Sequence, residues 1–273
     1  MTILIVGGDS AIGRAVVAEL DGRGCPVAAT SRRAGRHPSL DLAKSPATWE
    51  VPDASAALVA AGIGSLAACE ADEDQARAVN VTAVAALAQR VPFVLVLSTT
   101  QVFAGDRPHY PADTPVCPAN AYGRVKAEAE RVALAAGGAV LRLGKVLSPH
   151  LPLVKDFVAT LQAGGTVEAF ADMVLAPVTL EQVAALAADI LVGGLSGIHQ
   201  LSGDQDISYA DMARLMADSI GSGQVRETSA AARVPAHFIQ AHATLAATGG
   251  WTAPSSVEAV RMVLAQTLSL PGE

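Results

Sequence analysis

Short apolar runs alternate with alanine-rich stretches of helical length, and this alternation restricts the chain to a small group of folds. Continuous apolar strands joined by crossover helices are typical of a parallel sheet that is covered on both faces. Helices are expected at 11–20, 76–88 and 121–136. We therefore predict an α/β protein whose sheet strands lie at Ile3–Val6, 26–30, 39–42, 57–61, 93–97, Ala139–Leu143 and Gly197–Leu201.

A glycine-rich turn, Gly-Gly-Asp-Ser-Ala-Ile-Gly, follows the first strand directly. A pyrophosphate needs a tight turn, an open backbone and a free helix N-terminus, where amide groups and the helix dipole face the anion. Gly7 can make the turn, and Gly13 lets the helix lie close to the sheet. Ser10 stands where the dinucleotide pattern has its middle glycine, and a serine there can cap the helix and bond a phosphate oxygen. The pattern predicts a Rossmann-type doubly wound sheet, with a ligand-free turn as the alternative; the expected dinucleotide contacts are Gly7, Asp9, Ser10, Ala11, Ile12 and Gly13.

The end of the second strand, Thr30-Ser31-Arg32-Arg33, indicates which dinucleotide is bound. NAD binders usually place an acidic residue there for the ribose hydroxyls, whereas hydroxyl and guanidinium donors suit a 2′-phosphate. Ser31, Arg32 and Arg33 therefore favour NADP(H) over NAD(H), with a solvated arginine pair as the alternative. Further cofactor contacts are expected near the ends of the neighbouring strands, at Asp41, Leu42, Ala60, Ala61 and Gly62, and at Asn80 in the helix expected at 76–88.

The rhythm of strands and helices changes after Leu147. Residues 148–152 contain two prolines, 155–162 form a helical pattern, and about 205–273 carry short helices with no strong strand run. Open α/β sheets bind ligands at the carboxyl ends of their strands. We predict an NADP-binding domain of 1–147 plus about 173–203, and a small discontinuous C-terminal substrate lobe of about 148–172 plus 204–273.

Tyr122 and Lys126 are one helical turn apart, so their side chains share a face of the helix at 121–136. A phenol exchanges protons poorly near neutrality, and a nearby ammonium lowers its pKa by favouring the phenolate. The same lysine can also hold the nicotinamide ribose. The pair follows the strand at 93–97, after which Thr99 offers a hydroxyl that can polarise a substrate carbonyl. These three residues are the candidate catalytic group.

The candidate group matches the Ser/Thr–Tyr–Lys triad of short-chain dehydrogenases/reductases. Several segments resemble the extended branch of that family that handles nucleotide sugars, in particular its dTDP-4-dehydrorhamnose reductases. Residues 97–103 resemble S-T-D-Y-V-F, residues 118–126 resemble P-x-N-x-Y-G-x-x-K, and residues 141–146 resemble L-R-x-x-x-V near the nicotinamide. The resemblance runs from residue 3 to about 215.

The resemblance implies an NADPH-dependent reductase of a ketone, with a keto-sugar or sugar nucleotide as its small-molecule substrate. Tyr122 would donate the proton, Thr99 would bond the carbonyl oxygen, and Lys126 would lower the pKa of Tyr122. Tyr122, Lys126, Leu143 and Val146 would also contact the cofactor. The implied substrate contacts are Thr100, Gln101, Val102, Phe103, Asn120, Lys145 and His150.

The chain departs from the family around the expected substrate. Thr100-Gln101 replaces an Asp-Tyr pair, Ala112 stands where a glutamate is common, and Lys145 occupies a position often held by tryptophan. These differences lie near the expected substrate pocket, so they leave the identity of the deoxysugar open, whereas the reductase chemistry carries over. The Thr-Asp-Glu run of nucleotide-sugar dehydratases is missing, so dehydration is not expected.

Composition excludes several other classes. A net charge of −7 argues against a nucleic-acid or anionic-membrane surface. The three cysteines and six histidines show no metal-ligand spacing, and widely spaced cysteines indicate reduced thiols. The chain begins with a strand pattern rather than a signal peptide and has no apolar run of about 18 residues, so no membrane span and a cytoplasmic location are expected.

Two other functions are left open. An epimerase uses the same triad but retains its cofactor and returns the hydride to the substrate. A non-catalytic NADP-binding regulatory subunit can be built on the same fold, although the intact triad argues against it. A homodimer through an alanine-rich helix face at 76–88 or 121–136 is also left open.

Overall fold

The computed structural model describes residues 1–33, 37–232 and 239–270. It divides into two compact units that each collect separate stretches of the chain. The first comprises Met1–Ala104, Pro115–Leu143 and Leu180–His199. The second comprises Gly105–Thr114, Gly144–Thr179 and Gln200–Glu273.

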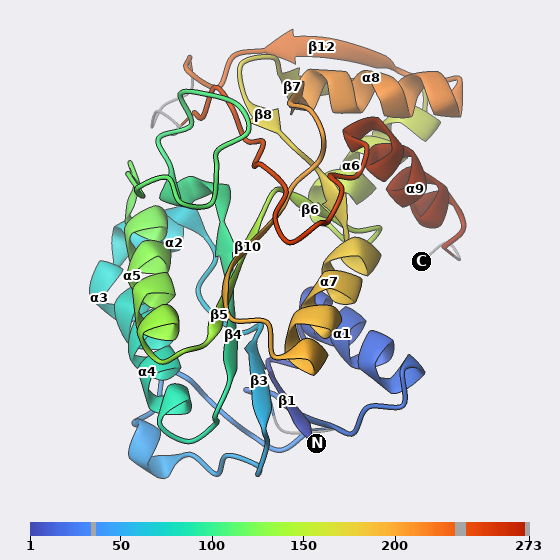
Figure 1. The fold of residues 1–273 in the computed structure, drawn as a ribbon. Coiled ribbons are helices and arrows are strands. Elements are labelled where there is room, and N and C mark those ends of the chain that lie inside the picture. Colours follow the sequence, from blue (N-terminus) through green and yellow to red (C-terminus); the bar gives the residue numbers. More distant parts are fainter. Residues whose placement is uncertain (34–36, 233–238, 271–273) are drawn as a thin grey trace. The chain divides into compact units, whose positions relative to one another are not determined.

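A six-stranded sheet forms the centre of the first unit, in the order β10-β5-β4-β3-β1-β2 (Figure 1). Strands β1 to β5 pair in parallel from one neighbour to the next. Their side chains are buried almost throughout β1, β3, β4 and β5, which explains the continuous apolar runs in the sequence. The strands are β1 (Ile3–Val6), β2 (Val27–Thr30), β3 (Ala56–Val59), β4 (Val94–Thr99), β5 (Ala139–Leu143) and β10 (Gly197–Leu201).

Helices cover both faces of this sheet (Figure 1). On one face, α1 (Ala11–Gly22) packs along α7 (Leu180–Gly193). The other face carries α2 (Leu66–Ala71), α3 (Glu73–Arg77), α4 (Ala83–Ala88) and α5 (Ala121–Ala135). The predicted doubly wound Rossmann-type sheet is confirmed. Two short 3₁₀ turns, Pro46–Thr48 and Thr100–Val102, complete the unit.

Two local predictions for the first unit were wrong. Residues 39–42 form no strand, because only Ser39 bridges to Ser31 before the chain turns, with Lys44 N donating to Asp41 O at 3.1 Å. The helix expected at 76–88 is interrupted by a π-helical turn, Ala78–Thr82, which separates α3 from α4. Within the residues that the structure describes, the sheet therefore has six strands rather than seven.

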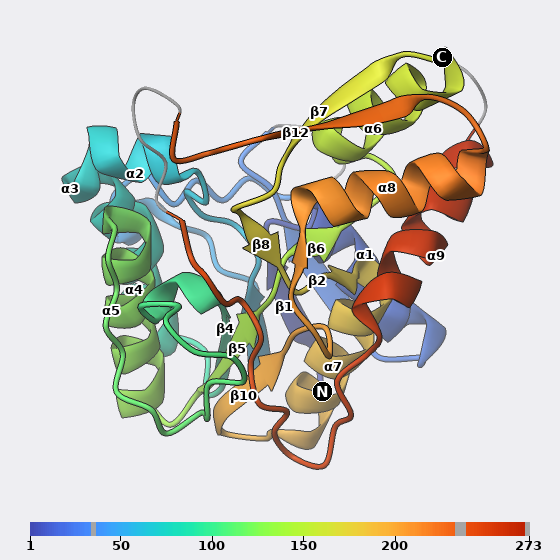
Figure 2. The same ribbon diagram turned by 90° about the horizontal axis from the view of Figure 1, so that it is seen from above.

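The described residues of the second unit form three helices and short paired strands. Figure 2 shows them from above. Its core includes Val154, Leu161, Met212 and Val263, which come from all three helices. The pairs are β7 with β12 and β6 with β9, both parallel, and β8 with β11, antiparallel. The elements are β6 (Val146–Leu147), α6 (Pro152–Gln162), β7 (Thr166–Phe170), β8 (Val174–Leu175), β9 (Val178–Thr179), β11 (Ile207–Ser208), α8 (Tyr209–Ile220), β12 (Gln224–Thr228) and α9 (Ser256–Leu268).

The expectation of no strand after residue 205 was wrong, because β12 pairs with β7 over five residue pairs. The unit boundaries also differ from the expected ones: the first unit ends at Leu143 rather than 147, and Gly105–Thr114 groups with the second unit. The assignment of nucleotide binding to one unit and substrate binding to the other stays a prediction.

Candidate active site

The glycine turn after β1 leaves no room for side chains. Gly7 has a φ of +89°, and a Cβ there would lie 2.7 Å from the Cβ of Ala61. A Cβ at Gly13 would lie 2.1 Å from the carbonyl oxygen of Gly7. The turn and the first turn of α1 therefore approach each other more closely than any other residue type would allow.

The N-terminus of α1 keeps backbone donors available. Ser10 caps the helix, its Oγ accepting from Gly13 N at 3.0 Å. The amide groups of Ala11 and Ile12 have no hydrogen-bond partner among the described residues. Asp9 and Ala11 are exposed. Two free amides at a positive helix end form a suitable site for an anion.

Cationic side chains flank this turn at the end of β2. Ser31 is buried, and its Oγ accepts from Arg33 N at 3.0 Å. Arg32 and Arg33 are both exposed, and neither forms an ion pair with another residue that the structure describes. Thr30 is fully buried, and its hydroxyl has no partner within the described ranges. The arrangement leaves two guanidinium groups available to a ligand.

Asn80 anchors the loop that follows β3. Its Oδ1 accepts from Ile63 N at 3.1 Å, and its Nδ2 donates to Ile63 O at 3.0 Å. The loop starts with Ala60 and Ala61, whose amides both donate to Val6 O at 2.9 Å. A Cβ at Gly62 would lie 2.3 Å from Asn80 Oδ1. Asn80 therefore supports the small-residue wall at 60–62.

The two other residues predicted near the nucleotide lie in the turn that replaces the expected strand. Asp41 is partly exposed, and its Oδ1 accepts from Ala43 N at 3.1 Å. Its carbonyl oxygen also accepts from the indole of Trp49 at 3.0 Å. Leu42 is buried in the core of the first unit. Asp41 thus shapes this turn through its Oδ1 and its carbonyl oxygen, which leaves the second carboxylate oxygen for another partner.

The predicted catalytic residues lie together in the first unit. Thr99 ends β4, and its side chain hydrogen-bonds with Tyr122 near the start of α5. Burial raises the pKa of Tyr122 to about 12, and the Thr99 hydrogen bond opposes that increase. Burial also lowers the pKa of Lys126 to about 8, against the opposing influence of the Glu130 carboxylate. The phenol is therefore protonated at neutral pH, with an ammonium group one helical turn away.

The start of α5 is held from three directions. Asn120 caps the helix, with its Oδ1 accepting from Gly123 N at 2.8 Å. Its Nδ2 donates to Gln101 Oε1 at 2.8 Å. Glu70 Oε1 accepts from Ala121 N at 2.7 Å. Asn120 and Gln101, both predicted to contact the substrate, are thus bonded to each other and position the residues around Tyr122.

A buried charged cluster lies behind these residues, and the sequence did not reveal it. Both carboxylate oxygens of Glu130 accept from Arg142, Oε1 from Nε at 3.0 Å and Oε2 from Nη2 at 2.7 Å. Ser98 Oγ also donates to Glu130 Oε1. The Arg142 guanidinium stacks over the ring of Phe103 at 4.8 Å from its centroid. The four-residue interval from Lys126 to Glu130 was the one signal in the sequence that pointed to the cluster.

Cys69 is a second group near the catalytic residues that sequence reasoning missed. It is fully buried in α2, and it interacts electrostatically with both Tyr122 and Lys126. Burial raises the pKa of its thiol. Its separation of more than 50 residues from Tyr122 hid this proximity.

The remaining predicted site residues are divided between the units. In the first, Thr100, Val102, Phe103 and Leu143 are buried. In the second, Lys145 and Val146 are partly buried, and His150 is exposed on a turn. Burial lowers the pKa of Lys145. Thr100, Gln101 and Phe103 already have partners within the protein.

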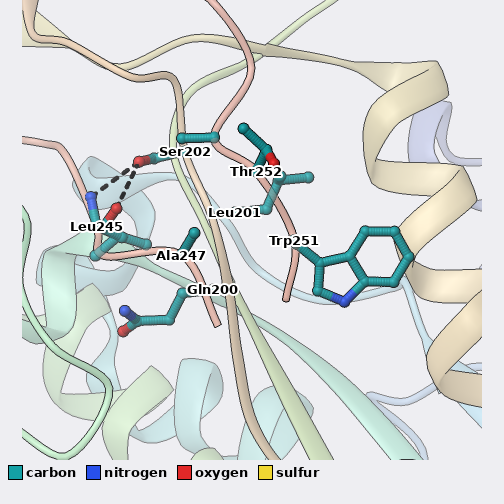
Figure 3. Close-up of a pocket in the computed structure, with 8 residues that line it drawn as sticks. Gln200, Leu201, Ser202, Leu245, Ala247, Trp251 and Thr252 are labelled. Atoms are coloured by element: carbon teal, nitrogen blue, oxygen red, sulfur yellow. Dashed lines mark hydrogen bonds between the residues drawn. The ribbon is translucent and has the colours of Figure 1, made fainter. Parts of the chain in front are cut away.

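The second unit contains a small pocket (Figure 3). Its lining includes Gln200, Leu245 and the indole of Trp251. Ser202 Oγ accepts from Leu245 N at 2.9 Å at one side of it. None of the predicted site residues lines this pocket.

Neither a metal-binding cluster nor a membrane-spanning helix is present in the part of the chain that the structure describes. No group of three or more His, Cys, Asp or Glu side chains there could hold a metal ion. His237, one of the histidines without metal-ligand spacing, lies outside that part. No described helix combines the length and the apolar character that crossing a membrane requires.

Comparison with known proteins gives a family and a set of structural relatives. The model of the RmlD substrate binding domain family matches residues 1–268. A dTDP-4-dehydrorhamnose reductase from Clostridium acetobutylicum superposes with a TM-score of 0.87 at 19% identity, over 98% of this chain and 100% of that one. No curated protein sequence matches the chain significantly.

Other solved structures carry nucleotides. A dTDP-4-dehydrorhamnose reductase from Bacillus anthracis, in complex with NADP, is 16% identical with a TM-score of 0.84, over 97% of this chain and 99% of that one. A UDP-glucose 4-epimerase from Thermus thermophilus, in complex with NAD, is 19% identical with a TM-score of 0.81, over 98% and 99%. At these identities the likeness establishes the fold.

Proposed function

The chain belongs to the RmlD substrate binding domain family, and we propose that it is an NADPH-dependent reductase of a ketone, with a keto-sugar or sugar nucleotide as substrate. The observation that carries this proposal is the hydrogen bond between Thr99 and Tyr122, with Lys126 one turn further along α5. The reductases among the structural relatives support the same chemistry.

The first unit fits an NADP(H) cofactor. Side-chain-free glycines at the β1–α1 turn and the open amides of Ala11 and Ile12 suit a pyrophosphate. Arg32 and Arg33 suit a 2′-phosphate, because each is exposed and available. The bound cofactor would supply the hydride. Replacing both arginines with alanine is expected to weaken NADPH binding at least tenfold while changing NADH binding little, as measured by fluorescence titration.

The protonation states suit reduction rather than oxidation. With a pKa of about 12, Tyr122 holds its proton at neutral pH and is ready to donate it to a carbonyl oxygen that gains negative charge. Lys126, with a pKa of about 8, is mostly an ammonium at pH 7 and stabilises the phenolate left behind. Thr99 would orient the carbonyl oxygen beside the phenol.

We propose different roles for the predicted substrate contacts. Gln101 and Asn120 support α5 through their mutual hydrogen bond, so we propose that they act on the substrate through the position of Tyr122. Lys145 and His150 stay proposed substrate contacts, because a partly buried amine such as Lys145 suits an anionic group of the substrate. Thr100 would contribute through its place beside Thr99.

The test combines purified protein, NADPH and a panel of keto-sugar nucleotides, with loss of NADPH absorbance as the readout. Tyr122→Phe removes the proton donor and is expected to lower kcat about 10²- to 10⁴-fold, the usual range for general acid catalysis. Tyr209→Phe is the matched control, because Tyr209 is also a partly buried phenol but belongs to the second unit. Equal turnover by wild type and Tyr122→Phe would remove Tyr122 from the mechanism.

An epimerase is the second candidate, supported by the UDP-glucose 4-epimerase among the structural relatives. Nucleotide that stays bound through purification, together with sugar interconversion and no net use of NADPH, would favour it. A non-catalytic NADP-binding subunit would bind NADPH and turn over no member of the panel. Failure to bind NADPH would contradict all three functions.

A further inference from the structure

We infer that Glu130 is a positioning residue that keeps Lys126 in its ammonium form, and that Arg142 and Ser98 hold the Glu130 carboxylate in place. The inference deepens the proposed reductase function and rests on it for its catalytic meaning. It assigns a role to a buried charged cluster that the mechanism does not otherwise use.

The spacing along α5 places three groups on one face. Tyr122, Lys126 and Glu130 follow one another at intervals of four residues. Side chains four apart on a helix are neighbours. Lys126 therefore lies between the phenol that it serves and a carboxylate that is only 3% exposed.

The partners of Glu130 fix its carboxylate in one position. Arg142 binds both of its oxygens, at 3.0 and 2.7 Å, and Ser98 donates a further hydrogen bond to Oε1. Such a charge-assisted bidentate pair has a defined geometry. Arg142 is itself 2% exposed and stacked on Phe103, so both Arg142 and Glu130 are held away from solvent. The negative charge is thus held at one place behind Lys126.

The electrostatic balance at Lys126 shows why this charge matters. Burial disfavours the ammonium, and Glu130 is the strongest influence in the opposite direction. Among the described residues, the other titratable group that acts on Lys126 is Cys69 of α2. Burial raises the pKa of its thiol, so Cys69 is neutral near pH 7. Without Glu130, burial would act on Lys126 almost unopposed. The lysine would then lose its proton in the pH range where a reductase needs the ammonium.

A purely structural ion pair is the competing explanation. Buried pairs often contribute little net stability, while removing one partner is costly because the other is left uncompensated. Both explanations predict that Glu130→Gln destabilises the protein. They differ in whether the protonation of Lys126 changes, and the test measures that directly.

The experiment follows the pH dependence of Lys126 acetylation by acetic anhydride. The folded full-length protein is labelled without nucleotide, and the acetylated fraction of Lys126 is read by mass spectrometry of its peptides after digestion. Only the neutral amine reacts, and exposed Lys44 is the internal reference. The wild-type midpoint is expected near pH 8. Glu130→Gln should move it down by about one pH unit and raise the relative rate at pH 7 about fivefold.

Two variants make the result specific. Glu130→Asp keeps the charge and should restore a midpoint close to that of wild type. Glu128→Gln removes a carboxylate from the same helix that pairs with Arg77 at the surface, and it should leave the midpoint unchanged. If Glu130→Gln does not fold, the double variant Glu130→Gln/Arg142→Met takes its place in the test, because it also removes the uncompensated guanidinium. An unchanged Lys126 midpoint in a folded variant without Glu130 overturns the inference.

Kinetics separates this inference from the proposed function. If the protein is a reductase, kcat/KM should decrease at high pH as Lys126 loses its proton. In Glu130→Gln this alkaline limb of the pH profile should move to lower pH by the same amount as the acetylation midpoint. A midpoint that moves in a protein with no reductase activity would refute the function and leave the effect of Glu130 on Lys126 intact. A limb that stays in place while the midpoint moves would overturn the catalytic role of Glu130.

Discussion

Replacing Lys126 with methionine should make the folded protein more stable while abolishing its activity. The pKa of Lys126 falls from 10.5 to about 8 on folding, mainly through burial. Each pH unit of such a difference corresponds to about 1.4 kcal/mol, so holding the ammonium in the folded protein costs up to about 3.4 kcal/mol near neutrality. Lys126 is partly exposed, so we expect a gain of about 1–3 kcal/mol.

The pH dependence of this gain follows from where the proton is bound. Below about pH 8 the lysine is charged in both states, and the full cost is present. Between about 8 and 10.5 the unfolded chain binds the proton and the folded protein does not, so wild-type stability rises with pH in this window. The advantage of Lys126→Met should therefore be largest below pH 8 and should vanish as pH approaches 10.5.

The assay is urea unfolding of wild type and Lys126→Met at several pH values from 6 to 10, without nucleotide, since a ligand that binds the folded state would add its own stabilisation. Lys44→Met is the control, because that lysine is exposed and carries no such cost. A variant that is less stable than wild type at pH 7, or more stable by the same amount at every pH, would refute the reasoning. Titrating groups that do not interact with Lys126 are common to both proteins and cancel in the difference, whereas Cys69 interacts with Lys126 and does not.

Two further substitutions test the turn and the second unit. Gly13→Ala places a Cβ 2.1 Å from Gly7 O, so it should weaken NADPH binding more than tenfold and destabilise the protein by about 1–3 kcal/mol. Gly22→Ala in the same helix has open space around its Cβ and should be neutral. Unchanged NADPH affinity in Gly13→Ala would contradict the proposed phosphate site. Tyr110→Phe removes a hydroxyl that accepts from the amides of residues 105–106 at 3.1 and 3.2 Å, and it should cost about 1–3 kcal/mol in urea unfolding, an effect that is absent if water satisfies those amides.

The sheet could be predicted because strands that are buried on both faces have continuous apolar sequences. The bounds expected for Ile3–Val6, Ala139–Leu143 and Gly197–Leu201 are those observed. The segment at 39–42 also contains two leucines that are buried in the structure, Leu40 and Leu42. Their burial is real, but a turn at Asp41–Lys44 prevents the ladder of hydrogen bonds that a strand needs.

The missed strand β12 shows the opposite case. Four of its five residues, Gln-Val-Arg-Glu-Thr, are polar, and most are exposed, so the strand has no apolar alternation that a sequence could display. Its conformation comes from pairing with β7, which lies more than 50 residues earlier. Pairing across such a distance is a property of the tertiary structure, and local propensity does not contain it.

The candidate site was predictable where it depends on local spacing. The four-residue interval of Tyr122 and Lys126, and the position of Thr99 at the end of a strand, both follow from the chain itself. Gln101 and Asn120 were expected to face the substrate, and the structure shows that they bond each other, so their contact with a substrate stays a prediction. Nothing local distinguishes an amide that contacts a ligand from one that fixes a helix, because the two uses need the same donor and acceptor groups.

The proton chemistry of the site depends on a balance that spacing alone does not reveal. Extending the four-residue interval once more leads from Lys126 to Glu130, so the sequence does place a carboxylate on the catalytic face. Its effect depends on burial, because on an exposed face the same pair would act in high dielectric and change the lysine pKa little. Arg142 makes a buried carboxylate tolerable, and it comes from β5 rather than from the helix. The fold therefore sets the lysine pKa near 8 by opposing two large influences, and a substitution in either one should change the pH at which the site works.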